Sequence, residues 1–155
     1  MTEWETLDLQ STPVGKLLHS ARWKPLLELN GLDEVTADRL LRLLLTHLTL
    51  DRVITSGLAL RLVMGPSTGV NLETLSKNLA ELTISKRAKL CVALGIASKN
   101  WKNDFDAFNA VRNRLSHFNP KVGLDQVKEL HSEKAFEECI QRGLRALQLN
   151  LPKSA

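Results

Sequence analysis

Apolar residues recur along the chain with the spacing of helices, and no stretch shows the strict alternation typical of a half-buried strand. The pattern predicts helices at about 16–29, 33–64, 71–82, 85–96, 99–118 and 124–149, with Pro25 as a kink or break in the first. Asn30-Gly31 and Gly65-Pro66 supply typical end signals for the first two. The sequence therefore predicts an all-α fold, an up-and-down helical bundle.

The helix predicted at 33–64 is the longest element, and its apolar residues cover more than one narrow stripe. These residues are Leu40, Leu41, Leu43, Leu44, Leu45, Leu48, Val53, Ile54, Leu58 and Leu62. A helix of this kind is buried inside a bundle or shared between a core and a partner subunit, so we expect a homodimer. Charged residues such as Arg42, Asp51 and Arg52 interrupt the stretch, which argues against the roughly 18 uncharged residues of a membrane span.

Composition bounds the class of protein. With 155 residues, 43% of them apolar and 25% charged, we expect one compact domain over 1–155, with 1–12 a flexible or loosely attached segment. That first segment is acidic, which excludes a secretory signal. Cys91 and Cys139 are isolated, so they suggest neither a disulfide framework nor a metal cluster. We therefore expect a cytoplasmic protein without a metal ion or cofactor.

The positive charge is concentrated in one part of the chain. Residues 85–121 hold eight basic and two acidic side chains, a balance of +6, although the whole chain carries only +4. Clustered Lys and Arg are typical of proteins that hold a polyanion. A solvated basic face is the other interpretation of the same residues.

The helix predicted at 99–118 has two different faces at 100° per residue. One is apolar and contains Trp101, Phe108, Val111, Leu115 and Phe118. The opposite face is polar and contains Asp106, Asn109, Asn113 and His117, flanked by Arg112 and Arg114. An imidazole can exchange a proton near neutral pH and a guanidinium matches phosphate oxygens, so this set suits metal-free cleavage of RNA. Alternatively, these residues simply suit solvent and the helix dipole.

Residues 112–117, Arg-Asn-Arg-Leu-Ser-His, resemble the R-x4-6-H motif of the HEPN superfamily, in the form with a polar residue directly after the Arg. The long Leu-rich helix and the segment Ser85 to Ile96 precede the motif as in the mannitol-repressor-like branch, and the resemblance covers about 36–120. It implies a HEPN-like helical domain, dimeric in many members, and a metal-independent endoribonuclease. Such proteins act as toxins of toxin-antitoxin pairs or in defence against phage.

The resemblance also implies residue roles. Arg112 would stabilise the scissile phosphate, His117 would transfer protons and Asn113 would orient or assist. The neighbouring polar residues of the same helix, Arg114, Asn109, Asp106 and Ser116, are expected to support the site or contact RNA. By the resemblance, Asp51 on the long helix would support the site as well. Two motifs would face each other across the homodimer, and RNA would leave as a 2′,3′-cyclic phosphate and a 5′-hydroxyl.

An antitoxin or other regulatory protein is a further expected partner. In HEPN toxins silenced by a nucleotidyltransferase, a Tyr two residues after the His is adenylylated. Here that position is Asn119, and the chain contains no Tyr, so this silencing route is excluded.

Two other functions fit parts of the sequence. A HEPN-like dimer without catalysis could act as a regulatory or protein-interaction module. Residues 88–96 and 97–114 could instead form a DNA-binding helix-turn-helix, although Trp101 and Phe105 suit base contacts poorly. On the long helix, His47 and Asp51 lie one turn apart and are predicted to form a structural pair.

Overall fold

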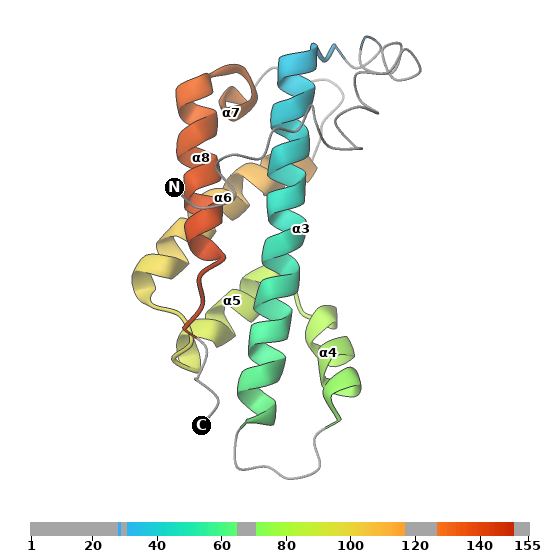
Figure 1. Cartoon of the computed structure of the whole chain (residues 1–155), viewed down its shortest axis with the longest axis vertical. Helices are drawn as coiled ribbons and strands as arrows, with labels where there is room; N and C mark the ends of the chain where they lie inside the picture. Colours follow the sequence, from blue (N-terminus) through green and yellow to red (C-terminus); the bar gives the residue numbers. More distant parts are fainter. Residues whose placement is uncertain (1–27, 29–30, 65–70, 117–126, 151–155) are drawn as a thin grey trace. The chain divides into compact units, whose positions relative to one another are not determined.

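The structure, a computed structural model, describes residues 28, 31–64, 71–116 and 127–150. Every regular element in these residues is a helix, so the all-α prediction is confirmed for them. The predicted helix at 16–29 lies outside them, apart from Glu28. The helices, coloured in chain order in Figure 1, are α3 (Glu34–Val63), α4 (Leu72–Glu81), α5 (Ile84–Ala93), α6 (Lys99–Ser116), α7 (Lys128–His131) and α8 (Glu133–Ala146).

The chain divides into two units, Met1–Arg42 and Leu43–Ala155, with the boundary inside α3. In the described part of the first unit, Gly31 has a φ of 66°, a conformation that glycine adopts without strain. The Asp33 carboxylate then accepts a 2.7 Å hydrogen bond from the backbone N–H of Thr36. This side-chain cap explains why α3 begins at Glu34, as the sequence predicts.

Local caps also set the helix ends of the second unit. Asn71 Oδ1 accepts from the N–H of Thr74 at the start of α4, and Thr83 Oγ1 accepts from the N–H of Lys86 at the start of α5. After α5, Gly95 takes a φ of 75°, and the N–H of Ile96 donates to the carbonyl of Cys91 at 3.0 Å. This Schellman ending stops α5 at Ala93, three residues before the predicted end.

The core of the second unit is built on the apolar face of α6. Trp101, Phe105 and Phe108 are at most 6% exposed, and the rings of the first two stack with centroids 5.5 Å apart. The prediction for Trp101, Phe108 and Val111 is confirmed, whereas Phe118 lies outside the described residues. The indole N–H of Trp101 donates to the carbonyl of Ala146 at 2.7 Å, which joins α6 to the end of α8. Burial of each large side chain contributes about 1.5–3 kcal/mol.

The single helix predicted at 124–149 is wrong within the described residues. Ser132 is extended, with φ −117° and ψ 119°, and separates α7 from α8. Its hydroxyl accepts a 3.3 Å hydrogen bond from the N–H of Ala135 and so caps α8. Because serine competes with the backbone in this way, the helix is interrupted even though its apolar periodicity continues.

Helix α3 has one buried and one exposed apolar side in the second unit. Leu43, Leu50, Ile54 and Leu58 are at most 3% exposed, whereas Leu44, Leu45 and Leu48 are 40–56% exposed. By length and composition alone α3 could cross a membrane, since an 18-residue window has a mean hydropathy of 1.3 with 39% of it buried. The core helix of a protein that meets no membrane passes the same test.

Candidate functional site

A polar cavity of about 400 Å³ lies among α3, α5 and α6 of the second unit. Three lining residues, Asn109, Arg112 and Asn113, belong to α6. The other lining residues are His47, Asp51, Thr83, Ile84, Ser85 and Arg87. Four predicted site residues, Asp51, Asn109, Arg112 and Asn113, therefore share one cavity. They come from two helices that are far apart in the sequence.

The motif residues lie near the end of α6. Arg112 and Asn113 are both partly buried, and Nη1 of Arg112 donates to Oδ1 of Asn113 at 3.3 Å. Ser116 is the last residue of α6, and His117 lies outside the described residues. The guanidinium of Arg112 is permanently charged and gives the cavity a group that matches phosphate oxygens.

Arg87 is a cavity residue that the sequence analysis missed. It is only 5% exposed, and its Nη1 donates short hydrogen bonds to the Asp51 carboxylate and the Thr55 hydroxyl on α3. Its Nε donates to the carbonyl of Leu82 at 3.2 Å. Arg87 therefore attaches α5 to α3 rather than belonging to a solvated basic face. The signal that could have identified it is a charged residue on the apolar face of α5, four residues before the buried Cys91.

The structure gives Asp51 a different partner from the one predicted. Its hydrogen bond is with Arg87, 36 residues away, and not with His47 one turn before it. A carboxylate that pairs with a buried guanidinium compensates a charge that would otherwise be costly to bury. Asp51 thus supports the cavity wall through Arg87.

His47 is another cavity residue, 8% exposed, and its Nδ1 has no hydrogen-bond partner among the described residues. Burial lowers the pKa of the imidazole, the charge of Arg112 lowers it further, and Asp51 opposes the shift. A pKa below the usual 6.5 keeps His47 neutral at pH 7. The neutral ring offers the cavity one hydrogen-bond donor and one acceptor.

Asn109 is 6% exposed, although the helical periodicity placed it on the polar face of α6. Its amide donates to the Ser85 hydroxyl at 3.3 Å, while its carbonyl oxygen has no partner among the described residues. The walls of one cavity thus contain two unpartnered buried polar atoms, Oδ1 of Asn109 and Nδ1 of His47. Buried polar atoms are normally paired, and a water molecule or a polar ligand in the cavity would satisfy these two.

Among the predicted site residues whose side chains the structure describes, Asp106 and Arg114 do not line the cavity. Asp106 is exposed and forms an i, i+4 ion pair with Lys102, with 2.6 Å between Oδ2 and Nζ. Arg114 pairs with Glu129 of α7, again at 2.6 Å. Helix α6 therefore distributes its polar residues among three environments.

The described residues contain no group of three or more His, Cys, Asp or Glu that could hold a metal ion. Cys91 is fully buried, and burial raises the pKa of its thiol to about 11. Burial likewise raises the pKa of Cys139 to about 12. Both thiols are therefore protonated at neutral pH and serve as core residues.

Replacement of Asp51 by alanine is expected to lower the free energy of unfolding by about 2 kcal/mol, because Arg87 then stays buried without its carboxylate. Urea unfolding followed by circular dichroism measures the change. Asp106→Ala is the matched control, since it breaks an exposed ion pair and should cost at most about 0.5 kcal/mol. Equal losses in both variants would contradict the structural role of the Asp51–Arg87 pair.

No family model, no curated protein and no solved structure matches this chain. The residues of the cavity and the motif therefore carry the assignment of function.

Proposed function

We propose that this protein is a metal-independent endoribonuclease of the HEPN type, acting as a toxin or as an effector of antiviral defence. The observation that carries the proposal is the shared cavity. The motif residues Arg112 and Asn113 line it together with Asn109 and His47, whose buried polar atoms lack partners among the described residues. A permanent positive charge beside such atoms suits a phosphodiester, which brings negative oxygens and a ribose hydroxyl.

In the proposed reaction the ribose 2′-oxygen attacks the adjacent phosphorus, and the bond from phosphorus to the 5′-oxygen breaks. Arg112 stabilises the negative charge that develops on the phosphoryl oxygens. His117 takes a proton from the nucleophile or gives one to the departing 5′-oxygen, and Asn113 holds the guanidinium of Arg112 in place. The products are a 2′,3′-cyclic phosphate and a 5′-hydroxyl.

The proposed active form is a homodimer in which two motifs face each other. The exposed leucines of α3, Leu44, Leu45 and Leu48, support it because a partner subunit would remove this apolar strip from water. They equally support the second candidate function, a HEPN-like regulatory module without catalysis. A DNA-binding helix-turn-helix is less favoured. Its recognition helix would begin near Trp101 and Phe105, and these side chains are buried, so they cannot contact bases.

The test is RNA cleavage by purified protein in EDTA, with His117→Ala prepared identically to reveal contaminating nuclease. We expect cleavage by the parent only, leaving cyclic phosphate ends detectable by mass spectrometry. A folded parent protein that leaves a mixed pool of RNA intact would favour the regulatory module. Equal cleavage by both proteins would contradict the proposed role of His117 in proton transfer.

A further inference from the structure

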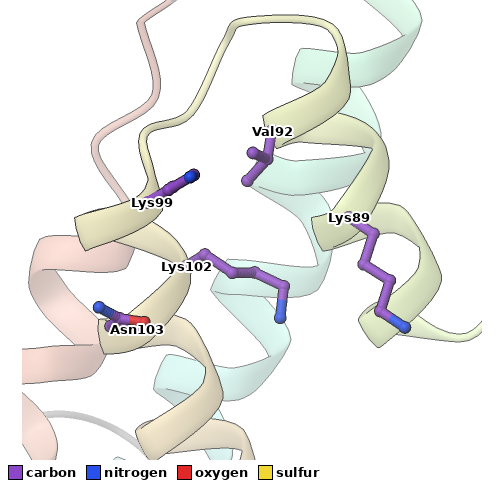
Figure 2. A pocket seen from close by; sticks show the side chains of 5 residues that line it. All are labelled: Lys89, Val92, Lys99, Lys102 and Asn103. Carbon is purple, nitrogen blue, oxygen red and sulfur yellow. The ribbon is translucent and has the colours of Figure 1, made fainter.

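A second cavity, of about 350 Å³, lies between α5 and the first half of α6. It is lined by Lys89, Val92, Lys99, Lys102 and Asn103 (Figure 2). In this view Lys102 extends from α6 toward α5, and the amine of Lys99 lies on the side facing Val92. Three lysines thus line one cavity that has no carboxylate in its lining, and in this view the amine of Lys89 points away from the other two.

The positive charge of this lysine cavity is only partly neutralised. Lys102 pairs with Asp106 and lies 5.9 Å from the centre of the Phe105 ring. Lys89 and Lys99 are exposed and form no ion pair within the described residues. Lys99 is also the first residue of α6, so the positive end of the helix dipole adds to the charge. An anion is the ligand that this arrangement favours.

The lysine cavity and the Arg112 cavity lie along the same seam between α5 and α6. Ser85 and Asn109 bridge the seam at the Arg112 cavity, with 3.3 Å between Oγ and Nδ2. Lys89 follows Ser85 by one turn on α5, and Lys102 precedes Asn109 by two turns on α6. Ten residues separate Lys102 from Arg112, a distance of about 15 Å along the axis at 1.5 Å per residue.

We propose that the lysine cavity binds a backbone phosphate of the same RNA strand whose scissile phosphate lies at Arg112, which rests on the proposed function. A stacked strand advances about 3.4 Å per nucleotide, so about 15 Å corresponds to four or five nucleotides, and to fewer if the strand is extended. Adjacent helices pack with axes about 8–10 Å apart, so the seam is a narrow track that a single strand can follow. The strand lies along the seam and crosses the Lys102–Asp106 pair.

The binding test uses a 12-nucleotide RNA with 2′-O-methyl groups, which lacks the nucleophile and cannot be cleaved. The variant is Lys89→Ala with Lys99→Ala, and both side chains are exposed, so the fold is retained. We expect binding about tenfold weaker, and a slope of log K against log salt that is smaller by about 1.4. The matched control, Lys128→Ala with Lys134→Ala on α7 and α8, removes the same charge from exposed positions outside the seam and should change binding less than threefold.

Substrate length gives the second test. The variant with Lys89→Ala and Lys99→Ala, called the seam variant, should cleave a 12-nucleotide RNA with a kcat/KM about tenfold lower than the parent, through a higher KM. On a dinucleotide, which cannot reach the lysine cavity, its kcat/KM should equal that of the parent. The site and the subsite can fail separately. If the parent protein binds RNA through Lys89 and Lys99 but does not cleave it, the proposed ribonuclease activity is contradicted and the proposed phosphate subsite is not.

Other results would overturn the proposed subsite itself. They are equal weakening by the seam and control variants, equally tight binding of duplex DNA and single-stranded RNA, or no measurable binding by the parent. Cleavage that the seam variant retains in full on the 12-nucleotide RNA would also overturn it.

Discussion

Replacement of Arg112 by alanine is expected to slow RNA cleavage by about 10² to 10³, the usual loss when a group that stabilises transition-state charge is removed. The structural reason is that Arg112 lines the polar cavity beside Asn113 and next to the neutral His47. Arg112→Lys keeps the charge but loses the planar pair of donors, so we expect it to recover only part of the rate. The measurement is single-turnover cleavage of a labelled RNA.

Two other arginine variants show whether the loss belongs to the cavity. Arg114→Ala breaks the ion pair with Glu129 outside the cavity and should lower the rate less than tenfold. Arg142→Ala removes an exposed guanidinium from α8 and should leave the rate unchanged. Circular dichroism and thermal unfolding confirm that each variant is folded. A rate for Arg112→Ala close to that of Arg142→Ala would contradict the proposed site.

Replacement of Gly143 by alanine is expected to lower the free energy of unfolding by about 2 kcal/mol, although alanine normally stabilises a helix relative to glycine. A Cβ atom at Gly143 would lie 2.7 Å from Cδ2 of Phe108 and 2.9 Å from Cγ2 of Thr46. Phe108 is 1% exposed and has little room to move. Gly143→Val should lose about 3 kcal/mol, at the upper end of overpacking effects. Urea unfolding measures both.

A double-mutant cycle tests this explanation. Phe108→Leu removes the ring edge that the new Cβ would meet, so Gly143→Ala should cost at least 1 kcal/mol less in that background than in the parent. Additive losses would show that the contact between Gly143 and Phe108 is not the cause. Because Asn109 directly follows Phe108, displacement of the ring should also slow cleavage if Asn109 supports the site.

Helix boundaries were predictable where the signal is local. Asn71 and Thr83 act through their own backbone neighbourhood, and a cap needs only residues within one turn. Gly95 is an equally local signal, although the predicted end of α5 lay three residues beyond the observed one. Ser132 uses the same local mechanism, but its place inside a continuing apolar pattern concealed it. The prediction followed the apolar periodicity and disregarded Ser132, whereas in the structure the side chain of Ser132 caps α8 and interrupts the helix.

The candidate site was predictable only in part. The motif located Arg112 and Asn113, and both line the cavity. The same helical face also predicted Asp106 and Asn109 as one polar row, yet Asp106 pairs with Lys102 and Asn109 is buried against Ser85. A helical wheel gives the direction of a side chain but not the neighbour that it meets, so it could not separate these two environments.

The sequence by itself determined that the described chain is helical, where most of its helices begin, and that α6 has an apolar side bearing Trp101 and Phe108. These properties depend on residues within one or two turns. Tertiary structure alone decided that Arg87 is buried with Asp51, 36 residues away, and that His47 lines the same cavity as Arg112. The physical reason is that burial and ion pairing depend on which helices pack together, and local sequence does not specify that packing.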